Sequence, residues 1–115
     1  MEIQPWFKEL PISICVSDAD GTILELNDLA RQTYAPEGKE IIQTNMLDCH
    51  PEPARTKLVE MMQNEITNIY TIEKNGKKSI IIHVPWYSQG KYQGHVELSL
   101  AIPDQMPHFV REPKK

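Results

Sequence analysis

The sequence lacks a long apolar run, a surplus of basic residues and the form of a signal peptide. The longest apolar cluster, SIIIHVPWY at residues 79–87, is too short to span a bilayer. Twelve basic residues face sixteen acidic ones, and the net charge of -4 argues against nucleic acid or a membrane as a partner. The first residues, MEIQPWFKELPI, contain no uninterrupted apolar segment, so no signal peptide is predicted. We therefore expect a cytoplasmic protein.

Cysteine is also scarce. In the cytoplasm Cys15 and Cys49 are expected to be reduced thiols rather than a disulfide. No Cys-x-x-Cys or His-x-x-x-His spacing occurs, so no structural zinc site is expected. The chain of 115 residues, 40% hydrophobic and 24% charged, is predicted to form one globular domain with its own core.

Alternating apolar and polar residues predict most of a β-sheet. The expected strands are residues 12–17, 23–26, 66–74, 79–87 and 92–102. The expected helices are residues 2–10, a short helix capped by Asn27, and residues 53–64. Asn75-Gly76 is a strong signal for the tip of a hairpin. This order predicts an α+β fold, with a five-stranded antiparallel sheet, helices on one face and an N-terminal flanking helix.

In two of these strands, residues 79–87 and 92–102, the side chains at alternate positions are strongly apolar, and we expect this side of each strand to face the helices. The residues on this side are Ile80, Ile82, Val84, Trp86, Val96, Leu98, Leu100 and Ile102. The opposite parity, which includes Ile81, His83 and Ala101, is then expected to face outward. His83 is accordingly interpreted as an exposed or interfacial residue.

The stretch SICVSDADGTILELND contains Asp-x-Asp-Gly-Thr, beginning at Asp18, which phosphatases of the haloacid-dehalogenase type use to present a nucleophilic aspartate. That chemistry needs a doubly wound parallel sheet and a downstream acidic pair to hold magnesium. After residue 28 the remaining aspartates, Asp48 and Asp104, have no neighbouring carboxylate in the sequence. We therefore interpret DADG as a turn, in which Gly supplies the positive φ.

Three segments in the right order resemble a PAS domain. DADGTILELNDLARQTY is similar to the opening of that family, where Asp-x-x-Gly ends a strand and Asn-x-x-Ala opens a helix. HPEP, at residues 50–53, resembles the landmark before the long helix, and YQGHVELSLAIPDQM resembles the last strand. Pro53 departs from the acidic residue usual there, and the Asn-Cys-Arg-Phe-Leu context of flavin-adduct light sensors is absent. Cys-His-Pro also resembles PAS modules attached to hemerythrin-like proteins of anaerobic bacteria.

The resemblance implies a non-enzymatic sensory or interaction domain for signal transduction. It divides the chain into an N-terminal amphipathic helix (1–11), the PAS domain (12–102) and a C-terminal tail (103–115). A small apolar or aromatic ligand, or a separate signalling protein, is the implied partner. The implied pocket residues are Met46, His50, Leu58, Met62, Tyr70, Ile82, Trp86 and Leu98.

The resemblance leaves the cofactor and the oligomeric state open. The first expectation is that no cofactor is held. The alternative is haem, in a redox or gas sensor, with His50 as the axial ligand. A homodimer is expected, and a pure dimerisation scaffold is a further alternative. The expected interface residues are Ile3, Trp6, Phe7, Leu10 and Ile81.

Overall fold

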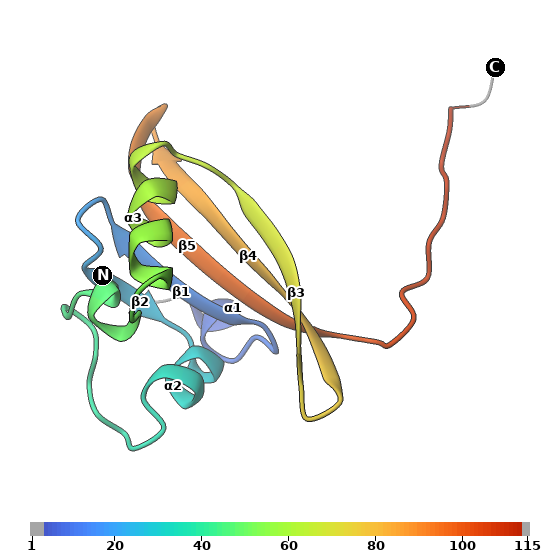
Figure 1. Cartoon of the computed structure of the whole chain (residues 1–115), viewed down its shortest axis with the longest axis horizontal. Coiled ribbons are helices and arrows are strands. Elements are labelled where there is room, and N and C mark those ends of the chain that lie inside the picture. Colours follow the sequence, from blue (N-terminus) through green and yellow to red (C-terminus); the bar gives the residue numbers. More distant parts are fainter. Residues whose placement is uncertain (1–3, 114–115) are drawn as a thin grey trace.

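The computed structural model describes residues 4–113, which form one antiparallel sheet with helices packed on it (Figure 1). The strands are β1 (Ser13–Asp18), β2 (Ile23–Leu26), β3 (Asn68–Lys74), β4 (Lys77–Ser88) and β5 (Lys91–Ile102), in the spatial order β2-β1-β5-β4-β3. The helices are α1 (Pro5–Lys8), α2 (Asp28–Tyr34), the short 3-10 helix η1 (Met46–Cys49) and α3 (Ala54–Gln63). The predicted fold class is confirmed, although α1 is shorter than the expected helix at residues 2–10.

The hairpin turns have the backbone that their sequences predict. Asn75 and Gly76, between β3 and β4, have φ values of 54° and 75°, and Gln89 and Gly90, between β4 and β5, have 53° and 77°. Two successive left-handed residues match the twist of the flanking strands, which is why Asn-Gly favours this turn. The predicted hairpin tip is confirmed.

Asp18 is engaged in a turn. Its Oδ1 accepts hydrogen bonds from the backbone N–H of Asp20 at 3.0 Å and of Thr22 at 2.9 Å. The Gly21 N–H donates to the Asp18 carbonyl at 3.0 Å, and Gly21 has a φ of 90°. All strand pairs in the described part of the chain are antiparallel, so the sheet is not the one that the phosphatase alternative requires.

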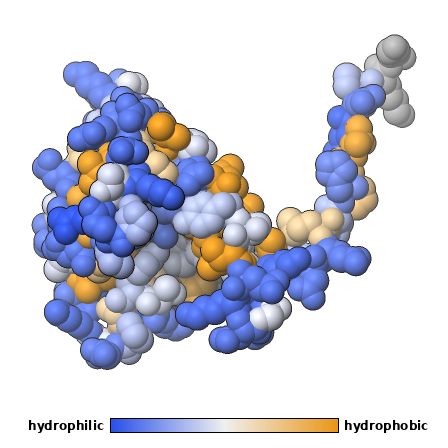
Figure 2. Space-filling model, in the orientation of Figure 1, coloured by the Kyte–Doolittle hydropathy of each residue, from blue (hydrophilic) through white to orange (hydrophobic). Residues whose placement is uncertain are grey.

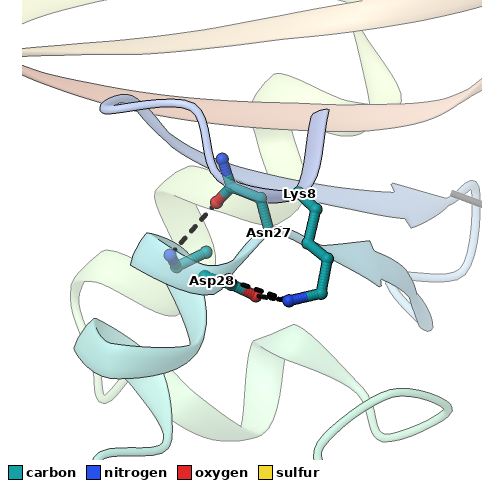
Figure 3. A network of polar contacts seen from close by, with 4 residues as sticks. Lys8, Asn27 and Asp28 are labelled. Carbon is teal, nitrogen blue, oxygen red and sulfur yellow. Dashed lines mark hydrogen bonds and ion pairs between the residues drawn. The ribbon is translucent and has the colours of Figure 1, made fainter. Parts of the chain in front are cut away.

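Asn27 joins the first strand to the helical layer. Figure 3 shows its contact with the start of α2. The buried Oδ1 of Asn27 accepts from the N–H of Ala30, which caps α2, and from the N–H of Ile14, both at 3.1 Å. Its Nδ2 donates to the carbonyl of Ile12 at 2.6 Å. Next to it, Asp28 forms an exposed ion pair with Lys8 of α1 at 3.0 Å. The predicted N-cap at Asn27 is confirmed.

The main core lies between the helices and the sheet. It consists of Cys15, Ile23, Leu26, Ala30, Ile41, Met46, Leu58 and Met62. Helix α3 contributes only Leu58 and Met62 to this core. Most of the core therefore covers β1 and β2, and fewer apolar side chains pack between α3 and the sheet.

The face of the sheet that meets α3 is the opposite of the predicted one. Ile81, His83 and His95 are buried on it, with exposed fractions of 7%, 4% and 2%. The alternate apolar residues of β4 and β5 lie on the outer face instead. Residues of β1 extend this apolar face, because they pair in register in the rows Ile82–Leu98–Ile14 and Val84–Val96–Val16. The prediction grouped these apolar residues correctly but assigned them to the wrong face.

The chain after β5 leaves the body as an extended segment without helix or strand (Figure 1). Its residues 103–113 are exposed, and hydrophobic side chains stand out along it in Figure 2. These are Met106, Phe109 and Val110. Within residues 4–113, no helix is long and apolar enough to cross a membrane.

Candidate functional site

A pocket of about 650 Å³ lies between α3 and the helix-facing side of β3, β4 and β5. One wall is α3, which contributes apolar groups in its depth and charged groups at its rim. The other wall is the sheet, which contributes Asn68, Tyr70, His83 and Glu97. The complete lining is His50, Ala54, Lys57, Leu58, Glu60, Met61, Asn64, Ile66, Asn68, Tyr70, His83 and Glu97.

A hydrogen-bonded chain of three side chains crosses the sheet at the base of this pocket. The Tyr70 hydroxyl contacts Nε2 of His83 at 3.0 Å, and Nδ1 of His83 contacts Nε2 of His95 at 3.1 Å. The Tyr70 and His83 rings are stacked, with their centroids 5.7 Å apart. Tyr70 lines the pocket, whereas His95 is almost completely buried. The chain thus connects the pocket to the interior of the sheet.

Burial disfavours the charged form of both imidazoles. Desolvation, followed by the unfavourable field of His83 and His50, lowers the pKa of His95 from 6.5 to about 4. Desolvation also lowers the pKa of His83, although the carboxylate of Glu97 acts in the opposite direction. Because a neutral imidazole has one donor and one acceptor nitrogen, the chain can be hydrogen-bonded in either direction, with the tyrosine hydrogen pointing to His83 or to the pocket.

Glu97 influences titratable groups on several elements around it. Burial, and then the field of Glu97, raises the pKa of the Cys15 thiol to about 12. The same two causes raise the pKa of Tyr70, and for Tyr34 a side-chain hydrogen bond to Glu97 adds to them. Glu97 also lines a second, much smaller cavity that lies against Cys15 and Tyr34. Its carboxylate is therefore a source of negative potential beneath the helices.

His50 lies at the junction of the two cavities, since it lines both. Its Nδ1 contacts the carbonyl of Met46 at 2.8 Å, so Nδ1 carries the hydrogen and Nε2 remains available. A histidine that binds a metal typically has this arrangement. Within residues 4–113, however, no group of three or more histidine, cysteine, aspartate or glutamate side chains is placed to hold a metal ion.

Only some of the predicted pocket residues line the pocket in the structure. His50, Leu58 and Tyr70 line the large pocket. Met46 and Met62 are buried in the core instead. Ile82, Trp86 and Leu98 lie on the outer face, so their expected inward orientation is wrong.

The sequence reasoning missed His83, His95 and Glu97. The sequence does contain a signal for them. His83 pairs with Glu97 in register, and Glu97 pairs with Cys15, so polar or small residues share one parity on three adjacent strands. Such a row is compatible with a polar site as well as with a solvated face. The prediction of an exposed or interfacial His83 is wrong because that row is the one covered by α3.

Some of the predicted interface residues are exposed and others are buried. Trp6 is 66% exposed, whereas Phe7 is buried and Leu10 half-buried. Ile81 is buried on the helix-facing side, so its predicted exposure is wrong. Ile3 lies outside the described residues.

The sequence matches no protein-family model and no curated protein, but the structure is similar to solved structures. A sensory box sensor histidine kinase from Vibrio cholerae has a TM-score of 0.65 at 16% identity, covering 84% of this chain and 86% of the other. The PAS domain of BvgS from Bordetella pertussis has 0.63 at 14%, covering 86% and 82%. The Aer2 receptor from Vibrio cholerae, described as a dual PAS-heme oxygen sensor, has 0.53 at 19%, covering 80% and 95%.

The strand order, with α2, η1 and α3 on one face, defines an α+β domain with a single antiparallel sheet. That arrangement, together with the structural similarities, is the PAS fold. The expected PAS architecture is confirmed, and the structures similar to it include sensor regions of signal-transduction proteins.

Proposed function

We propose that this protein is a non-enzymatic sensory domain in signal transduction, and that it receives its signal as a small molecule in the pocket between α3 and the sheet. The observation that carries the proposal is the pocket itself, of about 650 Å³, with a partly buried hydrogen-bonded chain opening onto it. A concave site with a few convergent polar groups and shifted pKa values is typical of ligand binding. A separate signalling protein would receive the output. The cytoplasmic location stays a prediction.

The proposed mechanism is a population shift. A molecule in the pocket would contact both Leu58 of α3 and Tyr70 of β3, because both line it. It therefore stabilises one packing of α3 on the sheet over others, by the difference in its affinity for the two packings. The segments that flank the domain would transmit this difference to a partner.

The proposed homodimer uses the outer face of the sheet, and its partner is a second copy of this chain. This face is apolar along three adjacent strands and includes a groove of about 720 Å³ lined by Val16, Trp86 and Val96 among others. In Figure 1, α1 is drawn fainter, behind the sheet as seen from the α3 side. There Trp6 meets Phe7 edge-on and remains largely exposed. Trp6 and the outer face together would form the contact, in place of the predicted Ile81.

Native mass spectrometry of freshly purified protein tests the ligand and the dimer together. We expect a dimer that carries an additional small-molecule mass. Ala54→Trp is expected to remove that mass, because Ala54 lines the pocket at an exposed position, and to leave the dimer intact. Ala101→Trp, at an exposed position on β5, is the matched control and should keep both. Equal bound mass in all three proteins would contradict a pocket ligand, and a monomer would contradict the dimer.

Haem is the second candidate ligand, and the geometry of His50 favours it. With Nδ1 held by the Met46 carbonyl, Nε2 is the nitrogen that would bind the iron and so tune its chemistry. The same purified protein would then show the mass of haem and a Soret absorption band. Loss of the band in His50→Ala supports this role, and a band that survives the substitution contradicts it.

A further inference from the structure

Glu97 is a half-buried carboxylate on the wall of the pocket, and no ionic partner is found for it among residues 4–113. The ion pairs in that range are Lys8–Asp28 and Arg31–Glu40, neither of which involves the pocket. A charge that is partly removed from water is costly unless a counter-charge or hydrogen bonds compensate it. The Tyr34 side chain hydrogen-bonds to Glu97, but no positive charge in the described part of the chain neutralises the carboxylate.

The side chains that line the pocket beside Glu97 do not neutralise its charge either. His83, its partner in register on β4, uses both ring nitrogens in the chain to Tyr70 and His95. Lys57 is the one lysine or arginine of the lining, but it is exposed on α3 and forms no ion pair within 4.0 Å in the described part of the chain. Apart from its histidines, the lining has two carboxylates, Glu60 and Glu97, against one lysine, so acidic groups outnumber basic ones.

The rest of the pocket determines the shape of a ligand. Its wall includes the apolar side chains of Ala54, Leu58, Met61 and Ile66. These groups can enclose a hydrocarbon or aromatic body while Glu97 contacts a polar head. Tyr70 adds a hydroxyl and a ring at the same wall, and a ring face is itself favourable for a cation.

We propose that the pocket binds an organic cation, with an ammonium or amidinium group against the Glu97 carboxylate and a compact apolar body against α3. This inference rests on the proposed function, because it names the ligand class of the same pocket. The carboxylate accepts hydrogen bonds from the cationic head, and these charge-assisted bonds are stronger than neutral ones. Lys57, at the rim, opposes the binding of a cation by its own charge.

Three compounds of similar size and different charge test the ligand class: 2-phenylethylamine, 2-phenylethanol and 3-phenylpropionate. Binding is measured by calorimetry and by shifts of the backbone amide signals of His83, Glu97 and Leu58. We expect saturable binding of the amine, at least about tenfold tighter than that of the alcohol, because only the amine carries a charge opposite to Glu97. Tighter binding of 3-phenylpropionate or the alcohol would overturn the cationic class, while leaving a pocket ligand intact.

Isosteric variants test the role of Glu97. Glu97→Gln is expected to weaken binding of the amine about tenfold or more, because it removes the charge and retains the shape. Glu60→Gln, the control at the exposed rim, should change the affinity by less than about threefold, since exposed charges interact weakly. Lys57→Gln should tighten binding of the amine by a similar small factor. An unchanged affinity in Glu97→Gln, or no binding of any of the three compounds, would overturn the inference. The native mass spectrum decides separately whether the pocket has a ligand.

Discussion

Gly94→Ala is expected to destabilise the domain by about 3 kcal/mol, at the upper end of the cost of overpacking. A Cβ at this position would overlap the carbonyl oxygen of Ser17 and lie 2.7 Å and 2.8 Å from the backbone carbon and Cα of Asp18. Backbone atoms of a central strand cannot move aside as a flexible side chain can. Gly94 lies between Asp18 of β1 and Trp86 of β4 in register, and the Trp86 indole donates to the Ser17 carbonyl at 2.9 Å.

Chemical unfolding with urea measures this effect, and Gly38→Ala provides the comparison. Gly38 has a φ of 80° but open space around its Cβ position, so only backbone strain of about 1 kcal/mol is expected there. Equal losses in the two variants would show that close approach of the strands does not require Gly94.

Asn27→Ala is expected to cost a similar amount, about 3 kcal/mol. The substitution removes the cap of α2, which accounts for about 1 kcal/mol. It also leaves the buried N–H of Ile14 and the carbonyl of Ile12 without their side-chain partner, at about 1–3 kcal/mol per buried group. The free energy of unfolding in urea, followed by circular dichroism, measures the loss.

Asn27→Ser separates the two functions of this side chain. Serine is a good N-cap for α2 but is too short to retain both contacts with Ile12 and Ile14, so an intermediate loss is expected. A loss in Asn27→Ala below about 1 kcal/mol, which a cap alone would explain, would contradict the role of Asn27 in joining the helix to the sheet.

Local features of the fold could be predicted because short-range chemistry determines them. Asn75-Gly76 forms its tight turn from its own backbone preferences, and Asn27 caps α2 from its position before the helix. Period-2 alternation located all five strands within a few residues. The predicted length of the first helix is wrong: the apolar spacing predicts a helix at residues 2–10, whereas the described helix α1 is Pro5–Lys8.

The covered face of the sheet could not be predicted from alternation. Since all neighbouring strands are antiparallel in the order β2-β1-β5-β4-β3, the edge strands β2 and β3 run in the same direction. The chain between them carries α2, η1 and α3, and the handedness of this crossover decides which face the helices cover. Alternation determines which residues share a face but not which face the helices cover. The prediction therefore placed Ile82 inside and His83 outside, the reverse of the structure.

The error about the covered face affects the predicted site more than the predicted fold. The sequence predicts a pocket that includes the apolar residues Trp86 and Leu98, whereas the structure has a partly polar pocket with His83 and Glu97. The apolar face that was expected inside lies outside, where it favours the proposed contact with a second copy. The predicted ligand class changes accordingly, from an apolar guest to a compact organic cation.

Nuclear magnetic resonance of the imidazole nitrogens, followed from pH 8 to pH 4, tests the central claim that the helix-covered face of the sheet is a buried polar site. We expect His95 to remain neutral at pH 6, and His83 to titrate below the ordinary pKa of about 6.5, because burial lowers the pKa of both rings. His95 should gain its second proton only near pH 4, because desolvation lowers its pKa. Titration of both rings near pH 6.5 would show that they face solvent, and would contradict both the hydrogen-bonded chain and the pocket built on it.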